Sequence, residues 1–160
     1  MSIWHKTIGL GVLGAALLCG CAPDPYSSNG GYLGADISPR KDWTASGTLS
    51  NPAFAIDGNL DTAALSDFQY TGAELTIDLH RPCVFQTVII EHGKEERGFA
   101  RKIAVATSVD GQVFTDRYVA GDSRKVAILS LPGAVLARYV RIRAITPSNQ
   151  PWSIAEVNLQ

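Results

Sequence analysis

The sequence has little excess charge of either sign, few cysteines and no apolar run long enough to span a membrane. Its 160 residues carry 14 Lys and Arg against 15 Asp and Glu, a formal net charge of −1. This balance argues against a protein that binds nucleic acid or an anionic lipid surface through a basic patch. An apolar fraction of 46% with 18% charged residues excludes a disordered chain and a multi-pass membrane protein. The length fits one globular domain with a short appendage.

The N-terminal apolar run covers only residues 8–18 and follows a short start that contains His5 and Lys6. A helix of this length cannot cross about 30 Å of hydrocarbon. Residues 1–20 are therefore predicted to be an export signal and not a transmembrane anchor. The run ends at Leu18-Cys19-Gly20-Cys21, which resembles the lipobox of bacterial lipoproteins. By this resemblance, cleavage follows Gly20 and Cys21 carries lipid.

A lipidated Cys21 predicts a protein that is anchored to a membrane without spanning it. The thiol can be alkylated by a diacylglyceryl group, and a further acyl chain can join the freed amine. One chain binds a bilayer marginally, whereas two or more bind it stably. The alternative is an ordinary secretory signal in which Cys21 is incidental. By the same resemblance, Ala22 in place of aspartate favours sorting to the outer membrane of a Gram-negative bacterium.

Residues 21–36 are rich in Gly, Pro and Ser and show no periodicity, which predicts a flexible tether ahead of a folded domain. Of the three cysteines, Cys19 leaves with the signal and Cys21 is lipidated, so Cys83 has no partner. No disulfide framework is therefore predicted, although the protein is exported. Cys83 enters an apolar segment, which is typical of a small buried hydrophobic residue.

From residue 37 onward the pattern is that of short strands. Residues 74–79 alternate strictly and place Leu75, Ile77 and Leu79 on one face. Further β-rich runs cover residues 84–91, 102–107, 126–131, 138–145 and 153–159, with turn signals between them. Helical periodicity is absent over any useful length of the mature sequence. Residues 37–160 are therefore predicted to form an all-β antiparallel sandwich, for which about 120 residues suffice.

Five segments occur in the order found in the discoidin family, also called coagulation factor 5/8 type C. They are AIDGNLDT at 55–62, LTIDL at 75–79, TSVDG at 107–111, ARYVRI at 137–142 and WSIAEV at 152–157. On these segments residues 40–159 resemble that family. The resemblance implies a jelly roll of the galactose-binding-like type and similarity to bacterial carbohydrate-binding modules.

The loop at residues 57–62 is the stretch richest in metal-ligand chemistry. Asp57, Asn59 and Asp61 stand at alternate positions and offer the hard oxygen donors that Ca²⁺ prefers. An EF-hand would need glycine at Thr62 and glutamate at Phe68, so that motif is rejected. A turn in which the Asp and Asn side chains cap their own backbone, with no metal, is the alternative.

The discoidin resemblance implies a structural calcium ion closed by a glutamate near the C-terminus. Carried over, Asp57, Thr62 and Glu156 supply side-chain oxygens, and Asn59 and Ala155 supply mainly carbonyl oxygens. Such an ion joins the first and last strands and stabilises the fold without doing chemistry.

Sugar recognition needs an aromatic face for the apolar side of a pyranose, flanked by polar groups for its hydroxyls. The predicted ligand-binding residues lie on two loops: Phe68, Tyr70, His92, Arg97 and Phe99. In sugar-binding members of the family an aromatic residue with His or Arg often forms the site, and Phe68 and Arg97 fit that pattern. Ala64 and Leu65 replace residues common in the family, which argues against transferring galactose specificity. Partial burial at the sheet edge is the alternative for the three aromatics.

A catalytic motif is not recognisable in the sequence. His80 and His92, the histidines of the mature sequence, lie in no nucleophile, metal or acid-base motif, and Glu95-Glu96 are adjacent residues in a polar loop. Arg141 and Arg143 are expected on a solvated face. The sequence therefore predicts a lipid-anchored, non-catalytic module that binds an envelope or extracellular glycan. The alternative is an envelope interaction or structural subunit that holds a protein partner.

Overall fold

The computed structural model describes residues 36–94, 98–121 and 124–160. These residues belong to one compact unit, Gly31–Gln160. The predicted export signal, the predicted lipidation site Cys21, residues 22–35 of the predicted tether and the candidate ligand residue Arg97 lie outside the described residues. Within the described part of the chain, no helix is long and apolar enough to cross a membrane.

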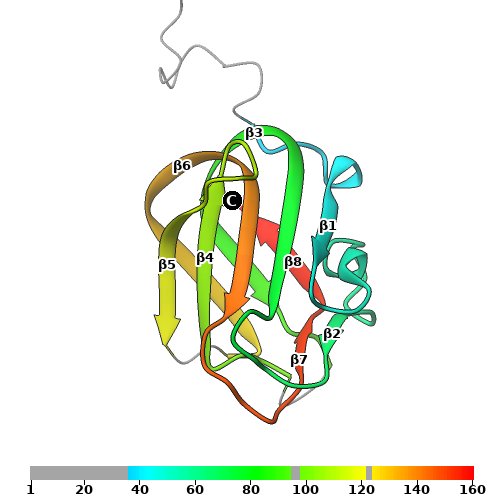
Figure 1. The fold of residues 1–160 in the computed structure, drawn as a ribbon. Helices are drawn as coiled ribbons and strands as arrows, with labels where there is room; N and C mark the ends of the chain where they lie inside the picture. The colour runs from blue at the N-terminus through cyan, green and yellow to red at the C-terminus, as the bar shows by residue number, and fades with distance from the viewer. Residues whose placement is uncertain (1–35, 95–97, 122–123) are drawn as a thin grey trace, which may run out of the picture. The chain divides into compact units, whose positions relative to one another are not determined.

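The described residues form strands joined by turns and two short 3-10 helices (Figure 1). All strand pairs are antiparallel, and the predicted all-β antiparallel sandwich is confirmed. The elements in chain order are η1 Arg40–Asp42, β1 Thr44–Gly47, η2 Pro52–Ala55, β2 Ala64–Ser66, β3 Glu74–Glu91, β4 Lys102–Ser108, β5 Thr115–Gly121, β6 Val126–Ala144, β7 Trp152–Ile154 and β8 Glu156–Leu159.

Two long strands, β3 with 18 residues and β6 with 19, belong to both layers of the sandwich. They pair with each other along most of their length, with register shifts between Asp78 and Cys83 and between Phe85 and Thr87. Figure 1 shows both strands curving over at the upper end and passing from one layer into the other. The first layer has the order β1-β3-β6-β4-β5, β8 pairs with the second half of β3, and β2 pairs with β7. Sequence patterns had predicted each long strand as two separate ones.

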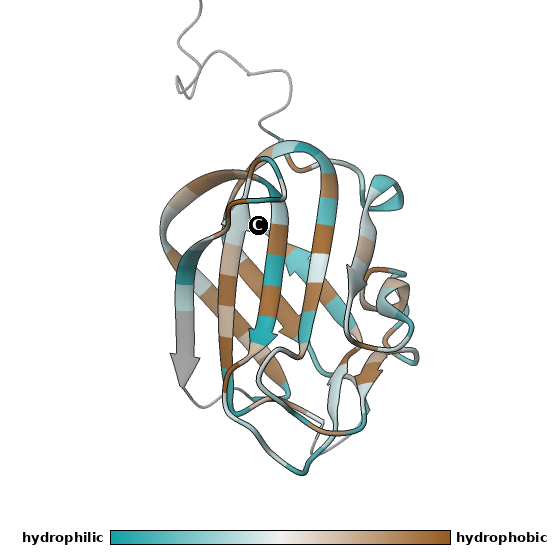
Figure 2. Cartoon of the chain, in the orientation of Figure 1, coloured by the Kyte–Doolittle hydropathy of each residue, from teal (hydrophilic) through white to brown (hydrophobic). Residues whose placement is uncertain are grey.

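The core fills the space between the layers with the apolar faces of these strands. Leu75, Ile77 and Leu79 have no exposed surface, as their strict alternation predicts. Figure 2 shows the same alternation of hydrophobic and hydrophilic residues along β3 and β6. Cys83 is also fully buried and has no disulfide partner among the described residues, which confirms its prediction as a small core residue.

The two ends of the sandwich carry different parts of the chain. The described part of the chain begins at the upper end in Figure 1, near the bends of β3 and β6. β2 and β7 lie toward the lower end, together with the loops at residues 66–73 and 145–151. The loop at residues 66–73, which carries Phe68 and Tyr70, is therefore at the opposite end of the sandwich from the start of the described residues.

Candidate functional site

One buried glutamine joins three loops at the lower end of the sandwich. Gln69 is 2% exposed, and its Nε2 donates to the carbonyl oxygens of Phe99 and Pro151, both at 3.1 Å. Its backbone N–H donates to the carbonyl of Ser148 at 3.0 Å, and the Ser148 N–H donates back at 2.9 Å. Because one side chain bridges segments far apart in sequence, it fixes the loops that carry the predicted aromatic residues.

Phe68 is the exposed aromatic residue of this loop cluster. Its side chain is 54% exposed, and its carbonyl accepts a hydrogen bond from Ser66 Oγ at 2.8 Å. Its ring centroid lies 5.6 Å from that of Tyr70, with the planes tilted by 55°. Tyr70 is half-buried and packs against the core, and Phe99 is also half-buried. Partial burial at the sheet edge therefore describes Tyr70 and Phe99 but not Phe68.

The structure corrects the prediction that His92 contacts a ligand. Its ring has no exposed surface and lies 6.3 Å from the ring of Phe99. Nδ1 lies 2.6 Å from the carbonyl oxygen of Ser153, and because a carbonyl only accepts, Nδ1 carries the proton. Ser153 Oγ donates to the His92 carbonyl at 2.6 Å. Burial lowers the pKa of the imidazole, opposed by the bond to Ser153. His92 is a core residue that supports the loop.

The loop at residues 57–62 is closed by its own hydrogen bonds. Asp57 Oδ1 accepts from the backbone N–H of Asn59 at 2.8 Å, and Asp57 Oδ2 accepts from Thr62 Oγ1 at 2.7 Å. Asn59 Oδ1 accepts from the N–H of Asp61 at 3.0 Å, and the Asn59 carbonyl accepts from Thr62 Oγ1 at 2.9 Å. This is the self-capped turn that the sequence left as the alternative to a metal loop.

The last predicted calcium ligand, Glu156, is also already paired. Its side chain is 6% exposed, Oε1 accepts from the N–H of Gly58 at 2.7 Å, and Oε2 accepts from the guanidinium of Arg40. The neighbouring Ala155 is buried, and its N–H donates to the carbonyl of Glu91 at 2.7 Å. Among the described residues no three His, Cys, Asp or Glu side chains gather as metal ligands. The side-chain oxygens of Asp57, Thr62 and Glu156 already take part in hydrogen bonds within the domain, and calcium stays a prediction.

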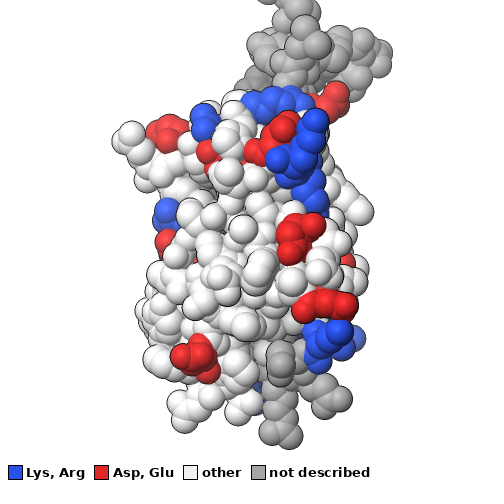
Figure 3. Space-filling model, turned by 90° about the vertical axis from the view of Figure 1, so that its right-hand side faces the viewer, with Lys and Arg blue, Asp and Glu red and all other residues white. Residues whose placement is uncertain are grey.

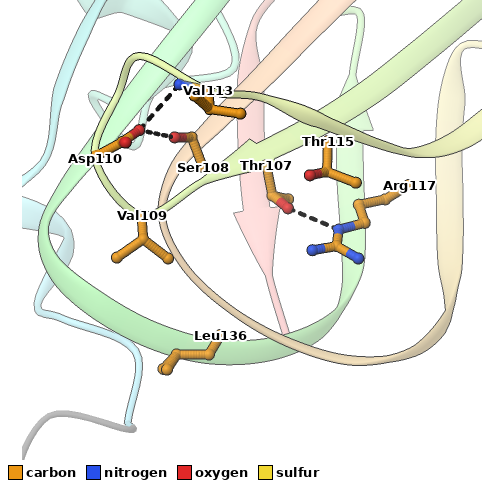
Figure 4. A pocket seen from close by; sticks show the side chains of 8 residues that line it. All are labelled: Thr107, Ser108, Val109, Asp110, Val113, Thr115, Arg117 and Leu136. Atoms are coloured by element: carbon orange, nitrogen blue, oxygen red, sulfur yellow. Dashed lines mark hydrogen bonds between the residues drawn. The ribbon is translucent and has the colours of Figure 1, made fainter.

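A hollow of about 190 Å³ lies beside the β4–β5 hairpin, remote from the loop cluster. Figure 4 shows its lining side chains, with Arg117 and Asp110 at opposite sides. Arg117 Nε donates to Thr107 Oγ1 at 2.9 Å. The N–H groups of Val113 and Gln112 and the Ser108 hydroxyl lower the pKa of Asp110. Asp110 is thus held by its own turn, and Arg117 Nε by the neighbouring strand β4. The lining residues are Thr107, Ser108, Val109, Asp110, Val113, Thr115, Arg117 and Leu136.

The family model of the F5/8 type C domain matches residues 36–157 of the sequence. The chain belongs to this family. The F5/8 type C assignment confirms the discoidin resemblance over nearly the whole of the described domain. No curated protein matches the sequence.

Solved structures with the same fold include bacterial carbohydrate-binding modules. The family 32 module of Clostridium perfringens NanJ, in complex with galactose, is 22% identical with a TM-score of 0.66, covering 76% of this chain and 95% of that one. The C. perfringens module CpGH89CBM32-5, in complex with GalNAc-β-1,3-galactose, is 20% identical with a TM-score of 0.67, covering 76% and 96%. The family 32 module of AlyQ, in complex with 4,5-unsaturated mannuronic acid, is 26% identical with a TM-score of 0.59, covering 81% and 98%.

Sequence reasoning missed two residues that organise this F5/8 type C domain. Gln69 lies between two predicted ligand residues, and a polar side chain flanked by loop aromatics is a signal that could have marked it. Arg40 follows Pro39 in a short polar stretch, and nothing in its local sequence indicates that it reaches Glu156, 116 positions away. Both act through contacts between distant segments.

Proposed function

We propose that this chain is a lipid-anchored, non-catalytic module that binds a carbohydrate of the cell envelope or its surroundings. The observation that carries the proposal is Phe68, a residue that is 54% exposed on a loop that Gln69 ties to two other loops. Removing an exposed aromatic ring from water is favourable when a partner covers it with an apolar surface. A pyranose presents an apolar face of matching shape.

Membership in the F5/8 type C family supports a sugar as that partner. The similar modules were crystallised with galactose, GalNAc-β-1,3-galactose and 4,5-unsaturated mannuronic acid. These ligands include neutral and acidic sugars, so the shared fold leaves the choice of sugar to the loops. Arg97 is included in the proposed site on the sequence pattern alone, as the polar residue that accompanies the aromatic Phe68.

The charge distribution supports recognition by a few loop side chains. On the face seen in Figure 3, charged side chains gather most densely toward the upper end, and those described lower down are scattered. Lys94 and Asp61 form an exposed ion pair, with Nζ 2.8 Å from Oδ1 and both side chains largely exposed. Such a surface does not attract a polyanion over long distances.

The lipid anchor and the membrane location form the second part of the proposal. The lipobox-like segment ending at Cys21 supports lipidation after export, and two or more acyl chains hold a protein on a bilayer stably. Ala22 supports delivery to the outer membrane of a Gram-negative bacterium. A module of this kind keeps a glycan close to the cell surface.

A glycan array probed with the full mature chain tests the sugar site. We expect binding by the wild type and a loss of about tenfold or more in affinity for Phe68→Ala, the scale of one aromatic contact. Arg97→Ala should weaken binding to the same ligands. Phe54→Ala is the matched control, because Phe54 is 39% exposed in η2 and lies outside the loop cluster.

Two outcomes would contradict the sugar site. Wild-type affinity in both Phe68→Ala and Arg97→Ala would move the ligand elsewhere on the domain. No glycan binding by the wild type would favour the alternative, an envelope subunit that holds a protein partner.

A further inference from the structure

The side chain of Arg40 connects the beginning of the domain to its last strand. Arg40 lies in η1, ahead of β1, and one terminal nitrogen of its guanidinium donates to Glu156 Oε2. The other donates to the carbonyl of Val157 at 2.5 Å and to Asn158 Oδ1 at 2.6 Å. The guanidinium carbon also lies 5.3 Å from the ring centroid of Trp43. The planar fork of arginine thus meets three successive residues of β8 at once.

The carboxylate of Glu156 requires a positive partner because it is almost fully buried. A buried carboxylate without one is strongly unfavourable. Gly58 supplies a neutral N–H at 2.7 Å, and Arg40 supplies the charge. Burial lowers the pKa of Arg40, while the nearby carboxylates of Asp57 and Glu91 raise it, and a guanidinium remains charged throughout the physiological range. The Arg40 guanidinium therefore supplies the positive charge that the buried Glu156 carboxylate requires.

We propose that the Arg40 guanidinium is the structural cation of this site and takes the place that the discoidin resemblance assigns to calcium. It joins η1 to β8 as the ion is expected to join the first and last strands. A divalent ion at Glu156 would lie against the guanidinium, and like charges at such separations repel strongly. The carboxylate oxygens of Asp57 are already turned into their own loop. The domain is therefore built to fold without calcium.

Thermal unfolding of the full mature chain tests the proposal independently of any glycan. We expect the wild-type Tm to stay the same in excess EDTA and in millimolar calcium. Arg40→Met keeps the apolar stem but removes the charge, and it should lower the Tm by about 5–10 °C. Arg40→Lys should recover only part of this loss, because one ammonium cannot reach all three acceptors. Lys41→Met, at the exposed neighbouring position, is the control and should leave the Tm unchanged.

A double-mutant cycle supplies the second measurement. Glu156→Gln removes the carboxylate at nearly constant volume, and the Tm loss of Arg40→Met/Glu156→Gln should fall short of the sum of the single losses. If Arg40→Met does not fold, refolding in the double variant supports the pairing, and failure to refold overturns it. A wild-type Tm that EDTA lowers and calcium restores overturns the proposal, and so do additive losses or an Arg40→Met as stable as the wild type.

Discussion

We expect the sandwich to lose stability as the pH falls below about 6.5, because His92 must take up a proton that its buried site does not accommodate. Burial lowers the pKa of His92 from its ordinary value of 6.5. In the unfolded chain the imidazole is protonated below that value, whereas in the folded chain its protonation begins at a lower pH. Its contribution to stability is therefore fully present above pH 6.5 and is lost as the pH falls toward the lowered folded-state pKa.

The size of the effect follows from one proton. The free energy of unfolding decreases by at most about 1.4 kcal/mol per pH unit in this window. Between pH 7 and pH 5 the loss is at most about 2 kcal/mol, because the unfolded-state pKa lies inside the interval. A loss of 1 kcal/mol lowers the Tm of a domain of this size by roughly 3–6 °C. The fall should therefore be visible in an ordinary thermal scan.

The assay compares three chains by circular dichroism between pH 7 and pH 5. His92→Asn keeps an N–H donor near the position of Nδ1 but does not titrate, so its Tm should vary less with pH than that of the wild type. His80→Asn is the control: His80 is exposed at φ +62°, a conformation that asparagine tolerates, and its pH profile should follow the wild type. An unchanged profile in His92→Asn would refute the reasoning, as would an NMR titration that gives His92 a pKa of 6.5 or above.

Two further predictions concern the backbone and the anchor. Gly47→Ala should destabilise the domain by about 2–4 kcal/mol in denaturant titrations, because a Cβ there would lie 2.2 Å from the carbonyl oxygen of Glu74. Gly58→Ala, with a positive φ but nothing within 4 Å of its Cβ, should cost only about 1–2 kcal/mol; equal losses would mean that the contact is not decisive. Cys21→Ala should move the protein from the membrane fraction to the soluble fraction and abolish palmitate labelling, whereas retention in the membrane fraction would argue for a different attachment.

The fold could be predicted because successive side chains of a strand point to opposite faces of the sheet. The residues that face the core of a sandwich are therefore apolar at every second position. Leu75, Ile77 and Leu79 revealed their burial by alternation alone. The continuity of the long strands could not be predicted in the same way. Pro82 and Pro132 read as breaks, yet both lie at exposed positions within bent strands. Local residues indicate where a chain turns, but not whether its pairing continues beyond the turn.

The candidate site was predictable only where it depends on local sequence. Phe68 stands in a polar loop and is exposed, as a loop aromatic predicts. His92 precedes Gly93, which has a φ of +76° at the turn. The ring of His92 is nevertheless buried and bonds to the carbonyl of Ser153, 61 positions away. Arg40 is similar, since its partners lie in β8. The residues next to Arg40 or His92 in the sequence do not indicate that these side chains contact segments far away in the chain.

The position of β8 has a consequence for the order of folding. Its four residues pair with β3 from Val88 to Glu91, and they also hold the guanidinium of Arg40 from the opposite end of the domain. Neither the pairing of β3 with β8 nor the hydrogen bonds of Arg40 to β8 can form before residues 156–159 are available. Assemblies dominated by such distant pairings fold slowly compared with helical bundles. A nascent chain of this topology therefore cannot complete the pairing of β3 with β8 until residues 156–159 have been made.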